Sequence, residues 1–209
     1  MTALTQASES TASSTESKPK ILFPGAATLL IAVIASRVTE IERAGNGWLL
    51  FAASGTTPGQ LCRAKFLALG APLAAVCVLW GLCVPMWGAL LGVPAPVPTG
   101  RIVAYTASVC VISLVILALQ LLISLASDNQ LLAVGAGMLG VLLSMIGAMA
   151  PTWAQYLTPW TYYSLVAPMT FTGSDPVYLD APFPGALVLA IAGAVAFTVI
   201  TTRLDRKEV

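Results

Sequence analysis

The chain has 209 residues, of which 57% are hydrophobic and only 9% are charged, and it contains no histidine. Soluble domains carry roughly 25% charged residues, so this composition excludes an ordinary soluble protein. The formal net charge of +1 leaves no basic surplus for binding nucleic acid. The sequence therefore predicts an integral membrane protein.

Residues 1–20 are polar and contain almost nothing that a protein core could bury. They lack the basic start, apolar run and small-residue cleavage site of a signal peptide. We predict a disordered tail over residues 1–20, followed by one transmembrane domain over residues 21–209.

Apolar segments are predicted to cross the membrane as five helices, over residues 21–36, 66–92, 102–126, 131–150 and 185–202. The first segment corresponds to about 24 Å of helix at ~1.5 Å per residue, which is less than the ~30 Å hydrocarbon core of a bilayer. The 19 charged residues, ten basic and nine acidic, all lie outside these segments. The spans therefore lack the ionisable groups that ion-coupled carriers and proton pumps usually hold inside the membrane.

Charges of both signs gather in the middle of the chain only at residues 37–65, between the first two predicted spans. Glu40, Glu42 and Arg43 form a charged head, and Trp48 begins an apolar patch that is too short to cross a bilayer. Such a patch suits the membrane surface. Further on, TPGQ has the pattern of a helix start, with a capping threonine, a proline at the first helical position and a glutamine that reaches back. We interpret the segment as a cytoplasmic platform from which the second span rises.

Small residues recur at every fourth position of the fourth predicted span: Ala136, Gly140, Ser144 and Ala148. Such a stripe lets another helix approach closely, either in ordinary packing or as a dimer face. The polar turn SDNQ before this span is tight, so the third and fourth spans are predicted to be antiparallel neighbours.

Residues 151–184 are rich in proline and aromatic residues and contain two aspartates but no Lys or Arg. Amphipathic aromatic side chains concentrate at the level of the lipid headgroups. We predict interfacial or re-entrant helices on the outer face; a simple long loop is the alternative.

Basic residues are distributed unevenly between the two sides of the predicted spans. With residues 37–65 inside, seven basic residues are cytoplasmic and three are outside: Arg37, Arg43, Arg63, Lys65, Arg203, Arg206 and Lys207 against Lys18, Lys20 and Arg101. The positive-inside rule favours this orientation. It predicts a cytoplasmic C-terminus and an external N-terminal tail, as in a six-span protein whose first span is absent.

Motifs for catalysis are missing, because the sequence has no GxxxxGK[ST] loop, no HExxH and no GxSxG. Asp128 and Glu40 suit loop and helix-end positions better than a catalytic pair. The four cysteines form no CxxC pair and are typical of small packing residues, rather than of a disulfide framework or a metal site. We predict that the chain by itself is not an enzyme and binds no metal or cofactor directly.

Four segments, taken in order, resemble the permease subunits of bacterial ABC-2-type exporters, in particular the small permeases of lantibiotic (bacteriocin) self-immunity systems. They are EIERAGNGWLLFAASGTTPGQLCRAKF after the first span, SDNQLLAVGAGMLG opening the fourth, PWTYYSLVAPM on the outer face and TTRLDRKEV at the end. Their order and membrane placement carry the resemblance more than any single motif. The departure from the family is its missing first span.

The resemblance implies an all-α, six-span permease fold, here with five spans, in a multi-pass protein of the bacterial cytoplasmic membrane. In such exporters the platform carries the coupling helix that docks on a separate ATP-binding subunit. This implies a coupling role for Glu40, Glu42, Arg43 and Trp48, for which a lipid-headgroup belt is the alternative. It also implies that external helices around the outer exit contain Pro159, Trp160, Tyr162 and Tyr163.

The function implied is ATP-driven export of an amphipathic antimicrobial peptide out of the membrane, for self-protection. The expected partners are the ATP-binding subunit that hydrolyses ATP, a second permease chain, identical or related, the lipid bilayer and the peptide cargo. Two other functions fit the same residues: a permease for another hydrophobic cargo such as a drug or lipid, and a non-transporting membrane scaffold or sensor.

Overall fold

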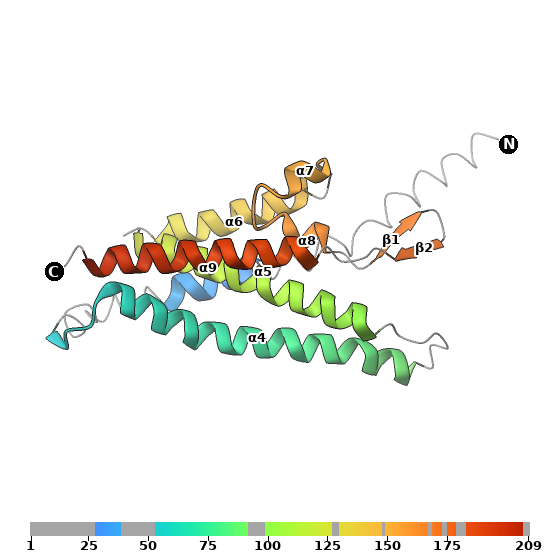
Figure 1. Cartoon of the computed structure of the whole chain (residues 1–209), viewed down its shortest axis with the longest axis horizontal. Helices are drawn as coiled ribbons and strands as arrows, with labels where there is room; N and C mark the ends of the chain where they lie inside the picture. Colours follow the sequence, from blue (N-terminus) through green and yellow to red (C-terminus); the bar gives the residue numbers. More distant parts are fainter. Residues whose placement is uncertain are drawn as a thin grey trace.

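The computed structural model describes residues 28–38, 53–91, 99–126, 130–147, 149–166, 169–172, 175–178 and 183–206. These residues are mainly helical, as the sequence predicts (Figure 1). The long helices are α4 (Pro58–Leu90), α5 (Thr99–Ala126), α6 (Gln130–Gly147) and α9 (Phe183–Arg206), and one further helix covers Thr28–Val38.

Among the described residues, three helices are long and apolar enough to cross a membrane: Pro58–Leu90, Thr99–Ala126 and Pro184–Arg206. They contain the second, third and fifth predicted spans, apart from the last residues of the second. The first and fourth predicted spans overlap shorter apolar helices. The 18 residues of α6 correspond to about 27 Å of helix, just under the ~30 Å hydrocarbon core. Three spans therefore have the required length, and the first and fourth remain predictions.

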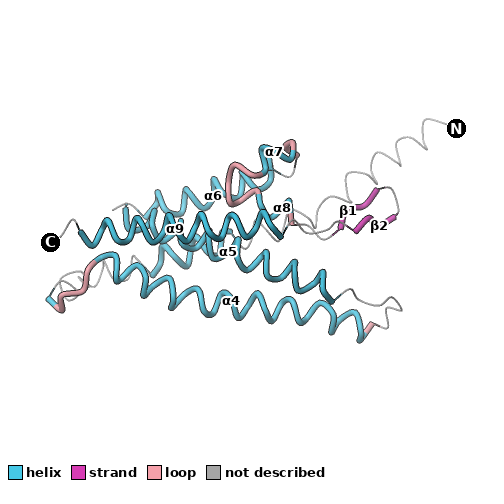
Figure 2. Tube along the Cα trace, viewed as in Figure 1, coloured by secondary structure: helices cyan, strands magenta, loops and turns pink. Residues whose placement is uncertain are grey.

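The central helix of the bundle is α5. It packs against α4, α6 and α9, and it carries many of the fully buried side chains, including Ile112, Ile116 and Leu121. Contacts also join α4 to α9. The helices α4, α5 and α9 therefore lie side by side, as Figures 1 and 2 show. Large apolar side chains cover the outer faces of α4 and α9. Soluble monomers rarely expose apolar surface on that scale, so these faces suit contact with lipid.

Gln120, the one strongly polar side chain of the third predicted span, is fully buried. With its amide oriented so that both groups bond, Nε2 donates to the carbonyl of Ala133 and Oε1 accepts from the N–H of Gly137, each at 3.2 Å. Both partners are backbone groups of α6. A polar group in an apolar interior is costly unless it is hydrogen-bonded, so Gln120 joins α5 to α6.

The helix start predicted at TPGQ, before the second span, is confirmed at α4. Thr57 is the N-cap: its Oγ1 accepts a hydrogen bond from the Gln60 backbone N–H (3.4 Å), and Gln60 Oε1 accepts one from the Thr57 backbone N–H (3.3 Å). Pro58 occupies the first helical position, where its missing N–H is not needed. The helix then continues through Pro72 and Pro85 to Leu90.

The outer aromatic segment, residues 151–184, contains two short helices, α7 (Thr152–Gln155) and α8 (Tyr162–Leu165). Their position on the outer face of the membrane remains a prediction. The segment also contains an antiparallel hairpin of β1 (Met169–Thr172) and β2 (Asp175–Tyr178). The hairpin was not predicted, and it departs from an all-α fold. Threonine, valine and aromatic residues in these strands favour extended backbone, which accounts for the difference.

The beginning of α4 and the end of α9 lie at the same end of the bundle, at the left of Figure 1, whereas α8 and the hairpin lie toward the other end. Spans that alternate in direction require this arrangement. Which end faces the cytoplasm remains the prediction of the positive-inside count.

Candidate functional site

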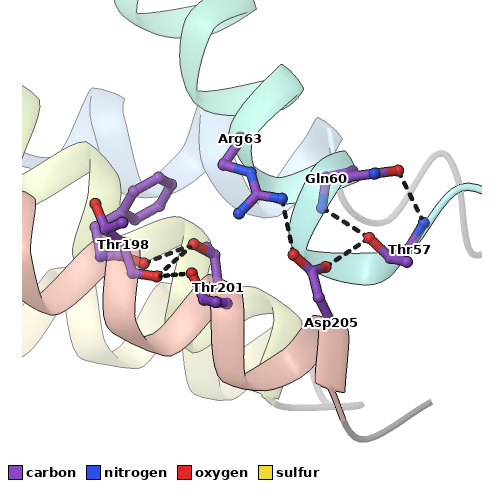
Figure 3. Close-up of polar contacts among 8 residues, drawn as sticks. Thr57, Gln60, Arg63, Thr198, Thr201 and Asp205 are labelled. Carbon is purple, nitrogen blue, oxygen red and sulfur yellow. Dashed lines mark hydrogen bonds and ion pairs between the residues drawn. The ribbon is translucent and has the colours of Figure 1, made fainter. Parts of the chain in front are cut away.

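Asp205, in the last turn of α9, connects that helix to the beginning of α4. Its Oδ1 accepts a hydrogen bond from Thr57 Oγ1 (2.5 Å), and its Oδ2 accepts one from Arg63 Nη2 (2.7 Å) (Figure 3). The threonine hydroxyl therefore serves both the cap of α4 and the contact between helices. We call Thr57, Gln60, Arg63 and Asp205 the Asp205 cluster.

Helix electrostatics favour this position for a carboxylate. The start of a helix carries a partial positive charge from its unsatisfied N–H groups, and its end carries a partial negative charge. Asp205 lies against the start of α4, while Arg203 and Arg206 occupy the last turn of α9. The start of α4 thus offsets the unfavourable place of Asp205 at the negative end of its own helix, where Arg203 and Arg206 are favourably placed.

Gly59 allows the two helices to approach closely within the Asp205 cluster. A Cβ atom at this position would collide with the Thr201 carbonyl oxygen and the Asp205 carboxylate. Thr201 is fully buried, and its hydroxyl donates to the Phe197 carbonyl (2.8 Å). The first turn of α4 consequently rests on the backbone of α9.

The surroundings of Asp205 hold the pKa of its carboxyl group below the ordinary value. The hydrogen bond from Thr57 is the largest cause; partial burial acts in the opposite direction, and the hydrogen bond and charge of Arg63 lower the pKa further. The ionised form of Asp205 is therefore the form that the folded protein favours.

This lowered pKa predicts a dependence of stability on pH. The stabilisation from ionised Asp205 is complete above the ordinary carboxyl pKa of roughly 4, and it is lost as the pH falls through the lowered value. We expect Asp205→Asn to lower the thermal unfolding midpoint in detergent at neutral pH, with the difference from wild type shrinking in acid. A difference that stays constant down to about pH 2, below any ordinary carboxyl pKa, would contradict the assignment.

An apolar groove of about 430 Å³ lies between α4, α5 and α9, next to the Asp205 cluster. Arg63 is the one charged residue among the described residues that line it. The rings of Phe66 and Phe197 form part of its wall, with their centroids 5.0 Å apart. Its volume falls within the range of roughly 300–1,000 Å³ that is usual for ligand pockets.

The residues predicted to couple to an ATP-binding subunit all lie outside the described residues: Glu40, Glu42, Arg43 and Trp48. Of the predicted platform, only residues 37–38 and 53–65 are described, and the second of these stretches contains the start of α4. The contact of that start with Asp205 connects the platform to α9.

The outer-face aromatic residues pack onto the bundle. Tyr162 and Tyr163 are buried, and the hydroxyl of Tyr163 is hydrogen-bonded to that of Ser113 on α5 (2.9 Å). Tyr156 meets Tyr162 edge to face, with 5.6 Å between ring centroids. Pro159 and Trp160 are half-buried in the preceding turn. The structure thus places these residues away from the Asp205 cluster, beside the start of α9 (Figure 1).

The small-residue stripe of α6 contacts another part of the same chain. A Cβ atom at Gly140 would collide with the indole of Trp160, and one at Gly147 would collide with Thr161. Ser144 is buried and its hydroxyl donates to the Val141 carbonyl (3.0 Å). Ala136 is half-buried, and Ala148 lies outside the described residues. Gly140 therefore accommodates the outer segment.

The four cysteines are all free thiols: Cys62, Cys77, Cys83 and Cys110. Cys77 on α4 meets Cys110 on α5. Among the described residues, no group of three or more His, Cys, Asp or Glu side chains could hold a metal ion.

Sequence reasoning identified the cap at Thr57 and Gln60 but not its connection to Asp205. At this end of the chain the sequence pattern indicated only the basic residues Arg203, Arg206 and Lys207. One signal was present, since Asp205 is an acidic residue among Arg203, Arg206 and Lys207. A carboxylate between two arginines of a helix end suggests a specific partner, but its identity depends on the packing of α4.

Comparison of the chain with models of known protein families, with curated proteins and with solved structures gives no match.

Proposed function

We propose that the chain is the membrane-spanning permease subunit of an ATP-driven ABC exporter, with an amphipathic antimicrobial peptide as its cargo. The observation that carries the proposal is the connection between the predicted coupling platform and α9. Thr57 and Arg63 belong to residues 37–65, and both bond to Asp205. A force applied to the platform would therefore act on two long apolar helices together.

The proposed mechanism requires no catalytic residue in this chain. A separate subunit binds and hydrolyses ATP, and its closure moves the platform through Glu40, Glu42, Arg43 and Trp48. The Asp205 cluster passes the movement to α4 and α9, which rearrange against α5. Coupling of this kind requires that the platform contacts differ between the two states.

The character of the bundle surface supports a cargo that partitions into the membrane. The outer faces of α4 and α9 are apolar, and the outer segment is rich in aromatic residues. An amphipathic peptide can reach such a surface from the bilayer, whereas an ion or a sugar would need polar groups along its path. A second permease chain, identical or related, would complete the pathway.

The experiment is affinity purification of the tagged full-length chain from native membranes in mild detergent, with mass spectrometry of its partners. We expect a stoichiometric subunit that contains a nucleotide-binding GxxxxGK[ST] loop. Absence of such a subunit, with the chain folded and intact, would contradict the exporter and favour the scaffold or sensor.

A matched variant tests the coupling residues in the same preparation. We expect Glu42→Ala combined with Trp48→Ala to lose most of the ATP-binding subunit and the resistance to the peptide, while insertion into the membrane is unchanged. Changing Arg101→Ala, at the start of α5, serves as a control that should retain both. Normal resistance in the double variant at normal expression would refute the coupling assignment.

A further inference from the structure

We propose that the groove between α4, α5 and α9 binds an acidic phospholipid, with an acyl chain along its apolar lining and its phosphate at Arg63. The proposal concerns a lipid that stays with the protein and does not depend on the exporter function. It follows from three features of the groove: its apolar lining, its charged end and its length along α9.

The lining suits a hydrocarbon chain. Small residues of α9 leave the space, namely Ala190, Gly193 and Ala194, and Val115 on α5 lies against Gly193. Leu67, on the rim, has 69% of its surface exposed, so the groove opens toward the surroundings of the bundle. These surroundings are hydrocarbon for a helix that crosses a membrane. An acyl chain can therefore enter sideways from the bilayer.

The end of the groove suits an anionic headgroup. The Arg63 side chain is 39% exposed, and its Nη2 donates to Asp205. A guanidinium has five N–H donors, so others are available for phosphate oxygens, which arginine binds in bidentate fashion. Asp205 holds the guanidinium in position. Arg203 and Arg206 lie exposed on the same helix end, so positive charge exceeds negative there.

The length of the groove along α9 is close to the hydrocarbon thickness of one bilayer leaflet. From Thr198 to Ala190 the lining descends eight residues of α9, or about 12 Å at ~1.5 Å per residue. Half of the ~30 Å hydrocarbon core is about 15 Å. Arg63 and Asp205 then lie at the level of the headgroups, on the side that the positive-inside count assigns to the cytoplasm. Basic pockets between helices on that side are typical binding sites for acidic lipids.

The test is native mass spectrometry of the full-length protein, titrated in mild detergent with phosphatidylglycerol or with phosphatidylcholine of the same acyl chains. We expect wild type to retain about fivefold more phosphatidylglycerol, the factor typical of one basic residue at a membrane surface. We expect Asp205→Asn to keep this preference, and Asp205→Asn combined with Arg63→Gln to lose it. Comparing these two variants avoids leaving a carboxylate without its arginine.

Two further variants test the place and the specificity of binding. Ala194→Phe fills the groove from an exposed position of α9 without changing charge, and should reduce retention of both lipids. Arg101→Gln, which removes an arginine at the start of α5, should leave the preference unchanged. The proposal would be overturned if the variant without Arg63 kept its preference, if Ala194→Phe bound like wild type, or if Arg101→Gln lost the preference equally.

Discussion

Gly59→Ala should markedly destabilise the protein, although alanine is a better helix former than glycine. The added Cβ atom would collide with the Thr201 carbonyl oxygen and the Asp205 carboxylate. Backbone cannot move aside as a flexible side chain can, so α4 must shift away from α9. Forced overpacking costs typically ~1–3 kcal/mol. For a chain of this size, each kcal/mol corresponds to roughly 2–4 °C in the thermal midpoint.

Gly100 offers a matched control for this substitution. It is the second residue of α5, as Gly59 is the second residue of α4, and a Cβ atom at Gly100 would meet nothing within 4 Å. We expect Gly100→Ala to leave the thermal midpoint unchanged or to raise it, by up to about 1 kcal/mol of helix propensity. Equal midpoints for the two variants would show that α4 and α9 do not approach as described.

The same substitution bears on the exporter proposal. If the Asp205 cluster passes movement from the platform to α9, Gly59→Ala should reduce peptide resistance further than its loss of stability explains. Resistance measured at a temperature where both variants are folded separates the two effects. Normal resistance in folded Gly59→Ala protein would leave the lipid proposal intact and would contradict this route of coupling.

Gly140→Leu should have the second large effect, because its side chain would occupy the place of the Trp160 indole. We expect a loss of about 1–3 kcal/mol in the free energy of unfolding. Gly135→Leu is the control on the same helix, since a Cβ atom at Gly135 would meet nothing within 4 Å. The measurement is the thermal unfolding midpoint of each variant in detergent.

A second substitution decides whether the stripe of α6 serves the outer segment or a dimer. Trp160→Ala should partly rescue Gly140→Leu, because it vacates the space that leucine needs. Residues in contact show coupling energies of about 0.5–3 kcal/mol in double-mutant cycles. If the two substitutions proved additive while Gly140→Leu altered the oligomeric state, the stripe would be a dimer face instead.

The outer segment and the platform meet the bundle in different ways. Tyr163 reaches α5 through Ser113, and Trp160 lies on Gly140 of α6, so the outer segment contacts each of these two helices in its middle part. At one end of the bundle, Asp205 joins α9 to α4. Both α5 and α9 contact the outer segment and also α4, so a change at the Asp205 cluster could reach the outer segment through either helix.

Local sequence patterns determined the membrane class and several helices. Long apolar runs without charge predict spanning helices because only a helix satisfies its own backbone groups in hydrocarbon. The cap at Thr57 and Gln60 was likewise predictable, because its partners lie three residues apart. The same local logic missed the β1–β2 hairpin, where pairing of two four-residue strands prevailed over the aromatic pattern of an interfacial helix.

Only the tertiary structure decided which distant residues meet. Asp205 lies 148 residues from Thr57 and 142 from Arg63, and no periodic pattern connects positions so far apart. Gly59 and Gly193 look like ordinary glycines in the sequence, and the stripe that contains Gly140 does not name its partner; only the packing shows what a Cβ atom would meet at each position. The groove beside Arg63 is bounded by three helices, so it exists only once those helices pack. Composition and local capping thus established a helical membrane protein, whereas the ion pair, the close approaches and the groove depend on long-range packing.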